Sequence, residues 1–370
     1  MEWGEDRTNK SYIWDWDHIK GWNYTPFFSF FNDFGDDLTF YQYIEFGAVA
    51  ILSLLSFIVT VLLMVFFLTK KHLRRDLHMY TISIMASSLV LLPFALLIGI
   101  TRLSPQGWLF GSLACKSTLF VLVMTAFVKI WLMTLISVDR YLRIVHSNHR
   151  CMGPKVSVIL ILVAWVLPVA TIAGIVYPNS RSLDVDIYGG ISFCTVGFQY
   201  HPTIRYSLMY FSTIFALEFI LPATIMIVCY SLIMRKINKS TKAILSHSKM
   251  NSLKVEKNLR TNIRRRRTTN ILIAIMSLFL VMWLPLFALI AIITLDQTME
   301  TFKLSSRWIV GQLCILLLNT LIEPFLYSFT AAKTRQELKR TLQSSCVKRK
   351  KNIPMTSIDE TLTQNCSSTS

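Results

Sequence analysis

Seven long apolar segments constrain this chain more than any other feature of its sequence. A helix needs about 20 predominantly apolar residues to cross the hydrocarbon core of a bilayer. Segments of this kind lie at 44–68, 77–100, 112–141, 156–177, 206–234, 268–294 and 308–330. The mean hydropathy of +0.48 is too high for an ordinary soluble domain. The sequence therefore predicts an all-α membrane protein, a bundle of seven transmembrane helices followed by a short amphipathic helix.

The placement of basic residues predicts the orientation of these helices. Cytoplasmic loops of membrane proteins carry an excess of Lys and Arg. Residues 235–267 hold twelve Lys and Arg against one acid, whereas residues 1–43 hold eight acids and three bases. We therefore expect a multi-pass protein of the plasma membrane, with an extracellular N-terminus and a cytoplasmic C-terminus. The net charge of +17 follows from this topology, so no nucleic-acid partner is expected.

Three regions follow from these segments. Residues 1–43 are expected to form an aromatic and acidic extracellular N-terminus. Residues 44–342 would form the helical domain with its amphipathic helix, and residues 343–370 a cytoplasmic tail rich in Ser and Thr. Asn9 and Asn23 begin sequons in the first region, so we expect both to be glycosylated.

Three cysteines have predicted roles that depend on the side of the membrane they face. Cys115 and Cys194 both fall on the extracellular side, where the environment is oxidising, so a disulfide between them is expected. Cys346 follows the amphipathic stretch on the cytoplasmic side, which makes it a candidate for palmitoylation.

Lys129 lies deep inside the third apolar segment, in the stretch FVKIWLMTLISVDRY at 127–141. It follows Cys115 by 14 residues and precedes Arg140 by 11. At about 1.5 Å per residue, Lys129 is roughly 15–20 Å from either residue, too far for its side chain to snorkel to an interface. A charge at this depth costs about 2.5–3.5 kcal/mol on insertion scales. Lys129 therefore needs an acidic partner, a water-filled cavity or a neutral form.

Short motifs recur at the ends and kinks of the apolar segments. They are GWLFG at 107–111, DRY at 139–141, FLVMWLP at 279–285 and NTLIEPFLY at 319–327, and 25 residues separate Cys115 from Arg140. At these intervals the motifs together resemble those of the rhodopsin-like (class A) G-protein-coupled receptors, across roughly residues 44–342. Two motifs depart from the family pattern: Met282 replaces a cysteine, and NTLIEPFLY stands where NPxxY is usual.

The resemblance implies a receptor that binds an extracellular ligand and activates a heterotrimeric G protein, with no enzymatic activity and no cofactor. The sixth span would swing outwards about Pro285, because proline removes a backbone hydrogen bond. Asp139 and Arg140 would form a charge-assisted pair that holds Arg140 until activation. A phosphorylated tail would suit the basic surface of an arrestin, and an inert tail is the alternative. The residues implied in the switch are Asp139, Arg140, Tyr141, Tyr230, Tyr327, Phe279, Trp283, Pro285, Pro222 and Ile130.

The resemblance also offers Lys129 an acidic partner. By position, Lys129 occupies a small hydroxyl position of the family's sodium site. The aspartate and the asparagine of that site correspond here to Ser88 and Glu323. We therefore expect a buried ion pair between Lys129 and Glu323 that replaces the sodium ion, with Ser88 and Asn319 as hydrogen-bonding neighbours. A neutral lysine and separate partners are the alternatives.

The clearest charge of the predicted ligand pocket is Glu218, one turn before Pro222. An acid within a membrane span is a functional candidate, although Glu218 could equally bond a neighbouring span. The aromatic and acidic N-terminus favours a basic peptide ligand, and a flexible ectodomain whose acids only follow topology is the alternative. The candidate pocket residues are Glu218, Leu122, Thr125, Trp283, Phe287 and Gln312.

Two other functions stay open at this point. One is a constitutively active or non-signalling receptor-like protein. The other is a seven-span ion or proton translocator that uses Lys129 and Glu323 as a relay, since ionisable pairs inside membranes mark such pathways. The combined motifs favour the receptor, and the sequence leaves the ligand, the G-protein class and the oligomeric state open.

Overall fold

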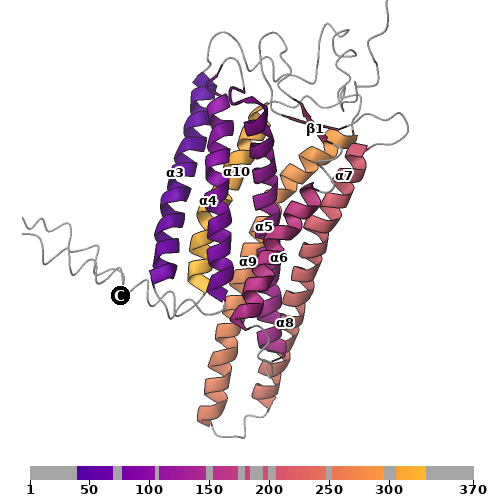
Figure 1. The fold of residues 1–370 in the computed structure, drawn as a ribbon. Helices are drawn as coiled ribbons and strands as arrows, with labels where there is room; N and C mark the ends of the chain where they lie inside the picture. The colour runs from indigo at the N-terminus through magenta and orange to yellow at the C-terminus, as the bar shows by residue number, and fades with distance from the viewer. Residues whose placement is uncertain are drawn as a thin grey trace, which may run out of the picture. The chain divides into compact units, whose positions relative to one another are not determined.

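A computed structural model of the chain describes residues 40–69, 77–104, 108–146, 153–173, 180–183, 195–198, 206–246, 252–295 and 306–330. The helices are α3 (Phe40–Thr69), α4 (Leu77–Thr101), α5 (Gly111–Val145), α6 (Pro154–Thr171), α7 (Tyr206–Phe215), the π-helical segment η4 (Ala216–Ile220), α8 (Leu221–Ser246), α9 (Ser252–Leu295) and α10 (Ser306–Thr330). The helices α7, η4 and α8 follow one another without a break and form one continuous span (Figure 1).

Every predicted apolar segment is helical over most of its described residues, and together the helices form the predicted bundle (Figure 1). Among the described residues, five helices are long and apolar enough to cross a membrane, and two shorter apolar stretches lie at Lys155–Thr171 and Val310–Pro324. The chain divides into two compact units, residues 1–327 and 328–370. Apart from the end of α10, the second unit lies outside the described residues, and so does the predicted amphipathic helix.

The structure corrects the predicted helix boundaries in the basic stretch 235–267. We expected a connection between spans, but α8 continues to Ser246 and α9 already begins at Ser252. Lys, Arg, Leu and Glu are good helix formers, so a charged stretch can prolong a transmembrane helix into water. The amide of Asn262 on α9 donates to Ser240 Oγ on α8 at 3.0 Å, which ties the two extensions together. Both helices extend beyond the rest of the bundle (Figure 1).

A two-stranded antiparallel hairpin adds to the predicted all-helical fold. It consists of β1 (Ser180–Leu183) and β2 (Thr195–Phe198) and lies between α6 and α7 in the chain. Its register pairs Ser180 with Phe198 and Leu183 with Thr195. Four residues per strand are too few for the sequence pattern to separate them from the surrounding loop.

The helix α5 lies at the centre of the bundle. It packs against α4, α6, η4 and α8, and more of its span is buried than in the other long apolar helices of the described chain. Its side chains Phe127, Ile130, Met133 and Ile136 belong to the largest core cluster, which also takes residues from α8 and α9. A polar side chain on the inner face of α5 is therefore held among protein atoms rather than lipid.

The motif GWLFG shapes the start of α5. Gly111 has a φ of +74°, a backbone conformation that glycine adopts without the steric cost that a Cβ brings. The buried Trp108 donates from Nε1 to Gly111 O at 2.8 Å and so closes the turn. This tryptophan fixes the entry of the chain into the central helix.

Gly99 marks the closest approach of α4 to α3. A Cβ added at Gly99 would lie 2.8 Å from Cγ1 of Val49, a fully buried and stiff β-branched side chain. Val49 also packs against Leu92 on α4 and Leu317 on α10 in a second core cluster. Glycine at position 99 is therefore needed for the contact between α3 and α4.

Gly99→Ala is expected to lower the free energy of unfolding by about 1–3 kcal/mol, because the added methyl group overpacks a rigid contact. Thermal unfolding of the purified protein in detergent measures the effect. The double variant Val49→Ala/Gly99→Ala should lose less than the two single variants added together, since it removes the clashing methyl groups that make Gly99→Ala costly. Gly311→Ala is the matched control, because a Cβ there meets nothing within 4 Å. Equal losses at both glycines would contradict this account.

Candidate functional site

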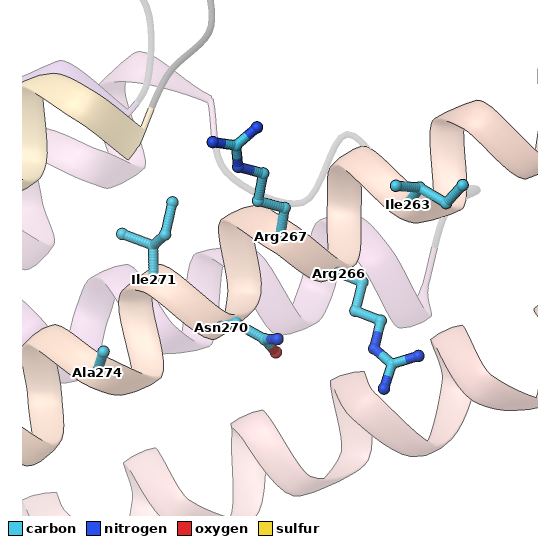
Figure 2. Close-up of a pocket in the computed structure, with 6 residues that line it drawn as sticks. All are labelled: Ile263, Arg266, Arg267, Asn270, Ile271 and Ala274. Carbon is cyan, nitrogen blue, oxygen red and sulfur yellow. The ribbon is translucent and has the colours of Figure 1, made fainter.

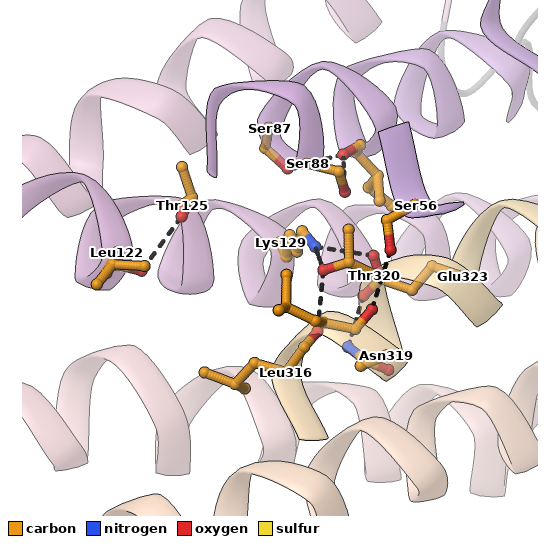
Figure 3. A network of polar contacts seen from close by, with 12 residues as sticks. Ser56, Ser87, Ser88, Leu122, Thr125, Lys129, Leu316, Asn319, Thr320 and Glu323 are labelled. Carbon is orange, nitrogen blue, oxygen red and sulfur yellow. Dashed lines mark hydrogen bonds and ion pairs between the residues drawn. The ribbon is translucent and has the colours of Figure 1, made fainter. Parts of the chain in front are cut away.

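Lys129 and Glu323 meet in the interior of the bundle. Lys129 projects from α5 and Glu323 from α10, and Lys129 Nζ lies 3.0 Å from Glu323 Oε2 (Figure 3). The two residues are only 2% and 1% exposed. The predicted contact between the lysine and the acid is therefore present, and it neutralises both charges at a depth where neither can reach water.

Two neighbours on α10 hold the pair in place. The Lys129 ammonium donates a hydrogen bond to Thr320 Oγ1 at 3.1 Å, and Thr320 Oγ1 donates to Leu316 O at 3.0 Å. The Asn319 amide donates to Glu323 Oε1 at 2.8 Å, as the prediction of Asn319 as a neighbour requires. One oxygen of Glu323 thus accepts a hydrogen bond from Asn319 while the other faces the ammonium (Figure 3).

The sequence prediction missed Thr320 and misassigned Ser88. Ser88 Oγ donates to Ile84 O of its own helix at 3.1 Å, so Thr320 rather than Ser88 supplies the hydroxyl that Lys129 contacts. Serine often satisfies itself on the preceding turn of a helix, which removes it from longer-range contacts. A usable signal was present, because Thr320 precedes Glu323 by three residues and i, i+3 side chains share a helix face.

Aromatic side chains gather near the predicted ligand pocket. The ring centroids of Trp283 and Phe287 on α9 are 6.4 Å apart, and Phe287 packs against Phe219 at 4.6 Å and Phe215 at 5.1 Å. Phe127 on α5 stacks on Phe287 at 6.5 Å. The structure therefore brings the predicted residues Trp283 and Phe287 together with three phenylalanines that the prediction missed.

A sequence signal for the aromatic cluster was available. Phe211, Phe215 and Phe219 are spaced four apart, the spacing that places side chains on one helix face. Their rings stack with centroid distances of 5.6 and 5.3 Å. The cluster thus runs along one face of α7 and η4 towards α9.

The other candidate pocket residues engage the backbone or the core. Thr125 Oγ1 donates to Val121 O at 2.7 Å, and Gln312 Nε2 donates to Met282 O at 3.1 Å, linking α10 to α9. Leu122 is partly buried on α5. The Trp283 Nε1 donor is buried and has no hydrogen-bond partner in the described part of the chain. That N–H is therefore available to a polar ligand group or a water.

The predicted role of Glu218 as a ligand-pocket residue is not supported by the contacts of its side chain. Glu218 is 0% exposed, Trp131 Nε1 donates to its Oε2 at 2.6 Å, and Thr171 Oγ1 lies 2.5 Å from its Oε1. Glu218 lies in η4, Trp131 on α5 and Thr171 on α6. The carboxyl group therefore joins three spans, and its oxygens are engaged by the protein instead of facing an open ligand site.

The C-terminal end of α5 also differs from the prediction. Asp139 does not pair with Arg140; Arg143 Nε donates to Asp139 Oδ1 at 2.9 Å and to Oδ2 at 2.8 Å. Adjacent residues on a helix point in different directions, whereas residues i and i+4 lie on one face. Arg140 Nε is buried and has no hydrogen-bond partner among the described residues, and the same holds for the Tyr230 hydroxyl.

The remaining switch residues lie in or near the core. Ile130 and Phe279 are buried in the main cluster, and Pro222 is buried at the start of α8. Phe279 packs on Trp283 with a centroid distance of 5.7 Å, and Pro285 lies inside α9 two residues further on. Tyr141 Oη lies 3.3 Å from His146 Nε2.

Several predicted sites lie outside the described side chains. They are the Tyr327 side chain, Cys194, Asn9, Asn23 and Cys346. Cys115 is buried near the outer end of α5, and the free cysteines among the described residues are Cys229 and Cys314. The pairing of Cys115 with Cys194 stays a prediction.

Comparison with known proteins gives the same family from the sequence. The profile of the 7 transmembrane receptor (rhodopsin family) matches residues 59–327. Somatostatin receptor type 1 of Rattus norvegicus is 27% identical over 261 residues, which cover 70% of this chain and 60% of the relative. The Tachykinin-like peptides receptor 86C of Drosophila melanogaster is 26% identical over 246 residues, covering 65% of this chain and 47% of that receptor. The chain thus spans about 60% of the length of the first of these relatives, and less of the second.

A solved structure gives the fold. The crystal structure of squid rhodopsin superimposes with a TM-score of 0.68 at 21% sequence identity, over 82% of this chain and 86% of that one. An identity this low supports the architecture of the bundle alone.

Proposed function

This chain belongs to the rhodopsin family of 7 transmembrane receptors, and we propose on that basis that it is a plasma-membrane receptor for an extracellular peptide that activates a heterotrimeric G protein. The observation that carries the proposal is the family match across residues 59–327. The relatives named for somatostatin and for tachykinin-like peptides favour a peptide ligand.

The proposed ligand region is the aromatic cluster on α7, η4 and α9. Aromatic side chains dominate many binding interfaces because they bury large rigid surfaces. The unpartnered Trp283 Nε1 supplies a donor that a polar ligand group or a water can satisfy. The acidic N-terminus, residues 1–43, would attract a basic peptide to this end of the bundle.

The proposed signal passes from Trp283 to the cytoplasmic end through α9. Trp283 contacts Phe279 one turn below, and Pro285 weakens the helix beside both. Ligand-driven movement of Trp283 would therefore swing the cytoplasmic part of α9 outwards and open a groove for a helix of the G protein. Tyr230 and Tyr327 would then turn towards Arg140. An arrestin is a further proposed partner of the tail.

Within this mechanism, we propose that the pair of Lys129 and Glu323 replaces the family's sodium ion. The ammonium of Lys129 would supply the positive charge that the metal supplies elsewhere. Its distance of 3.0 Å from Glu323 and the support from Asn319 and Thr320 favour this role. A covalently attached cation does not dissociate, so the inactive state would be stabilised without an exchangeable ion.

A second candidate function is signalling without ligand, and one observation favours it. Asp139 pairs with Arg143, so it does not form the ion pair with Arg140 that the family pattern implies for the inactive state. An Arg140 that its neighbour does not restrain would be free to contact a G protein in the absence of peptide. The translocator would use the pair of Lys129 and Glu323 as its relay, but the two residues are only 2% and 1% exposed, which does not favour a water-connected pathway.

Nucleotide exchange on purified heterotrimeric G proteins tests both candidates. The full chain in nanodiscs is assayed without peptide and with somatostatin or a tachykinin-like peptide as probes. We expect exchange above the receptor-free rate and its loss in Arg140→Ala. Exchange that does not exceed the receptor-free rate under any condition would contradict both functions.

A further inference from the structure

A dense group of positive charges surrounds the cytoplasmic part of α9. Arg264, Arg265, Arg266 and Arg267 are consecutive and exposed, and the apolar part of the helix begins at Ile271. The neighbouring helix α8 adds exposed cations at Arg235, Lys236, Lys239 and Lys242. These charges are consistent with the predicted membrane topology, and they have no role in the proposed signalling mechanism. Their position at the end of an apolar span places them at the level of lipid headgroups.

Two of the four arginines line a hollow. A shallow hollow of about 530 Å³ runs along one side of α9. Its lining consists of Ile263, Arg266, Arg267, Asn270, Ile271 and Ala274 (Figure 2). These positions are spaced by three and four residues, so they form one continuous helix face. Arg264 and Arg265 belong to the same run of charge but do not line the hollow.

The chemistry of the hollow changes along the helix. Arg266, Arg267 and Asn270 all line the hollow, although the side chains of Arg266 and Arg267 leave α9 in different directions (Figure 2). Ile271 and Ala274 follow in the direction of the membrane span, with Ala274 about 10 Å beyond Arg267 at 1.5 Å per residue. The hollow therefore has a cationic, hydrogen-bonding end at the membrane surface and an apolar end inside the bilayer.

This order of groups fits an amphiphile with an anionic head. Guanidinium groups bind phosphate through paired N–H donors, and clusters of basic residues beside a transmembrane helix attract anionic lipids of the cytoplasmic leaflet. A lipid with one phosphate and a compensating ammonium gains little from two arginines. A headgroup with several phosphates can offer one phosphate to Arg266 and another to Arg267, whose side chains leave the helix in different directions, while an acyl chain lies along Ile271 and Ala274.

We propose that this hollow on α9 is a binding site for a phosphoinositide, an inner-leaflet phospholipid whose headgroup carries several phosphates. The lipid contacts α9, the helix that moves in the proposed signalling mechanism, so its occupancy would influence that movement. The site itself does not depend on signalling. It requires that the arginines lie at the cytoplasmic surface of the membrane.

Binding of a fluorescent phosphoinositide to the full chain in nanodiscs of zwitterionic lipid tests the proposal. Energy transfer from the protein to the lipid gives the affinity. Arg266→Gln/Arg267→Gln should weaken binding by at least about tenfold, since each basic residue near the membrane surface adds to the attraction for anionic lipid. Arg264→Gln/Arg265→Gln is the matched control, because it removes the same charge from the same turn of α9 at positions that do not line the hollow. It should weaken binding clearly less.

Two further arms separate the lipid from other ligands. A soluble inositol polyphosphate should compete with the lipid at the arginines. Ala274→Phe should weaken binding of the lipid but leave binding of the soluble headgroup unchanged, because only the lipid has a chain at the apolar end. The arginines and Ala274 are all exposed, so each of these variants should unfold at a temperature near that of the wild type.

Three results would overturn the proposal. Equal losses in the two double-arginine variants would indicate diffuse attraction to the whole basic surface. Equal affinity for phosphatidylserine at matched charge would exclude recognition of several phosphates. Unchanged lipid binding in Arg266→Gln/Arg267→Gln, combined with lost nucleotide exchange, would assign the hollow to a protein partner.

Discussion

Lys129→Met is expected to lower the free energy of unfolding by about 3–5 kcal/mol, because it leaves the carboxylate of Glu323 buried without its counter-ion. Glu323→Leu should cost a similar amount by leaving the ammonium unpaired. Both charges lie where water cannot replace the lost partner, since the two residues are 2% and 1% exposed. Unfolding of the purified protein in mixed detergent micelles measures these free energies.

The double variant Lys129→Met/Glu323→Leu makes the prediction specific to the contact. Replacing both partners by apolar groups removes the buried charges altogether, so the double variant should lose less than the two single variants added together. Some loss remains, because the Asn319 amide gives up its bond to Glu323 Oε1. Additive losses would contradict a direct interaction between the two side chains.

An exposed ion pair on the same protein is the control. Arg260 and Glu256 pair on the surface of α9, with side chains 73% and 53% exposed. Glu256→Gln should change the free energy of unfolding by no more than about 0.5 kcal/mol, because water screens an exposed pair.

The proposed replacement of the sodium ion by Lys129 can be tested in the same unfolding assay. Unfolding temperatures in sodium chloride and in choline chloride should agree for the wild type, since no bound sodium adds stability.

Glu218→Ala is expected to lower the free energy of unfolding by about 2–5 kcal/mol, through a cavity and an unsatisfied buried donor. Trp131 Nε1 loses its acceptor at 2.6 Å. The Thr171 hydroxyl is affected less, because Pro168 O at 3.0 Å and Leu167 O at 3.1 Å remain as acceptors. The same unfolding assay measures the loss.

Glu218→Gln is the matched variant and should stay within about 1 kcal/mol of the wild type. Its amide oxygen can accept from Trp131, and its amide nitrogen can donate to Thr171 Oγ1 while that hydroxyl donates to Pro168 O. Trp131→Phe should lower the free energy of unfolding less in the Glu218→Ala variant than in the wild type. In that variant the Trp131 Nε1 donor, which the substitution removes, has already lost its acceptor. If Glu218→Gln destabilises as much as Glu218→Ala, the hydrogen-bond assignment is wrong.

The deep position of Lys129 illustrates how far sequence reasoning can reach. The apolar length around Lys129 excludes snorkelling, so the need for an internal partner follows from distance along one helix. The choice of Glu323 came from the resemblance of NTLIEPFLY to a family motif, and the structure brings the two side chains to 3.0 Å. The identity of the supporting hydroxyl was missed, because the family resemblance pointed to Ser88, whereas Thr320, three residues before Glu323 on the same helix face, makes the contact.

Asp139 and Glu218 illustrate where the reasoning stops. The family pattern suggested Arg140 for Asp139, but the helix geometry favours Arg143 at i+4, a rule that was available from the sequence. Nothing local distinguishes a ligand-facing Glu218 from one that joins spans. Its partners Trp131 and Thr171 come from helices that lie 87 and 47 residues away in the chain.

The sequence alone determined the number and approximate position of the spans, because a bilayer imposes a length and a polarity that can be counted along the chain. It also determined that a buried lysine needs compensation. The tertiary structure alone decided which side chains meet, through the rotation of each helix about its axis and the rotamers packed between helices. Partner choice for Lys129, Asp139 and Glu218 depends on those angles, and no one-dimensional pattern specifies them.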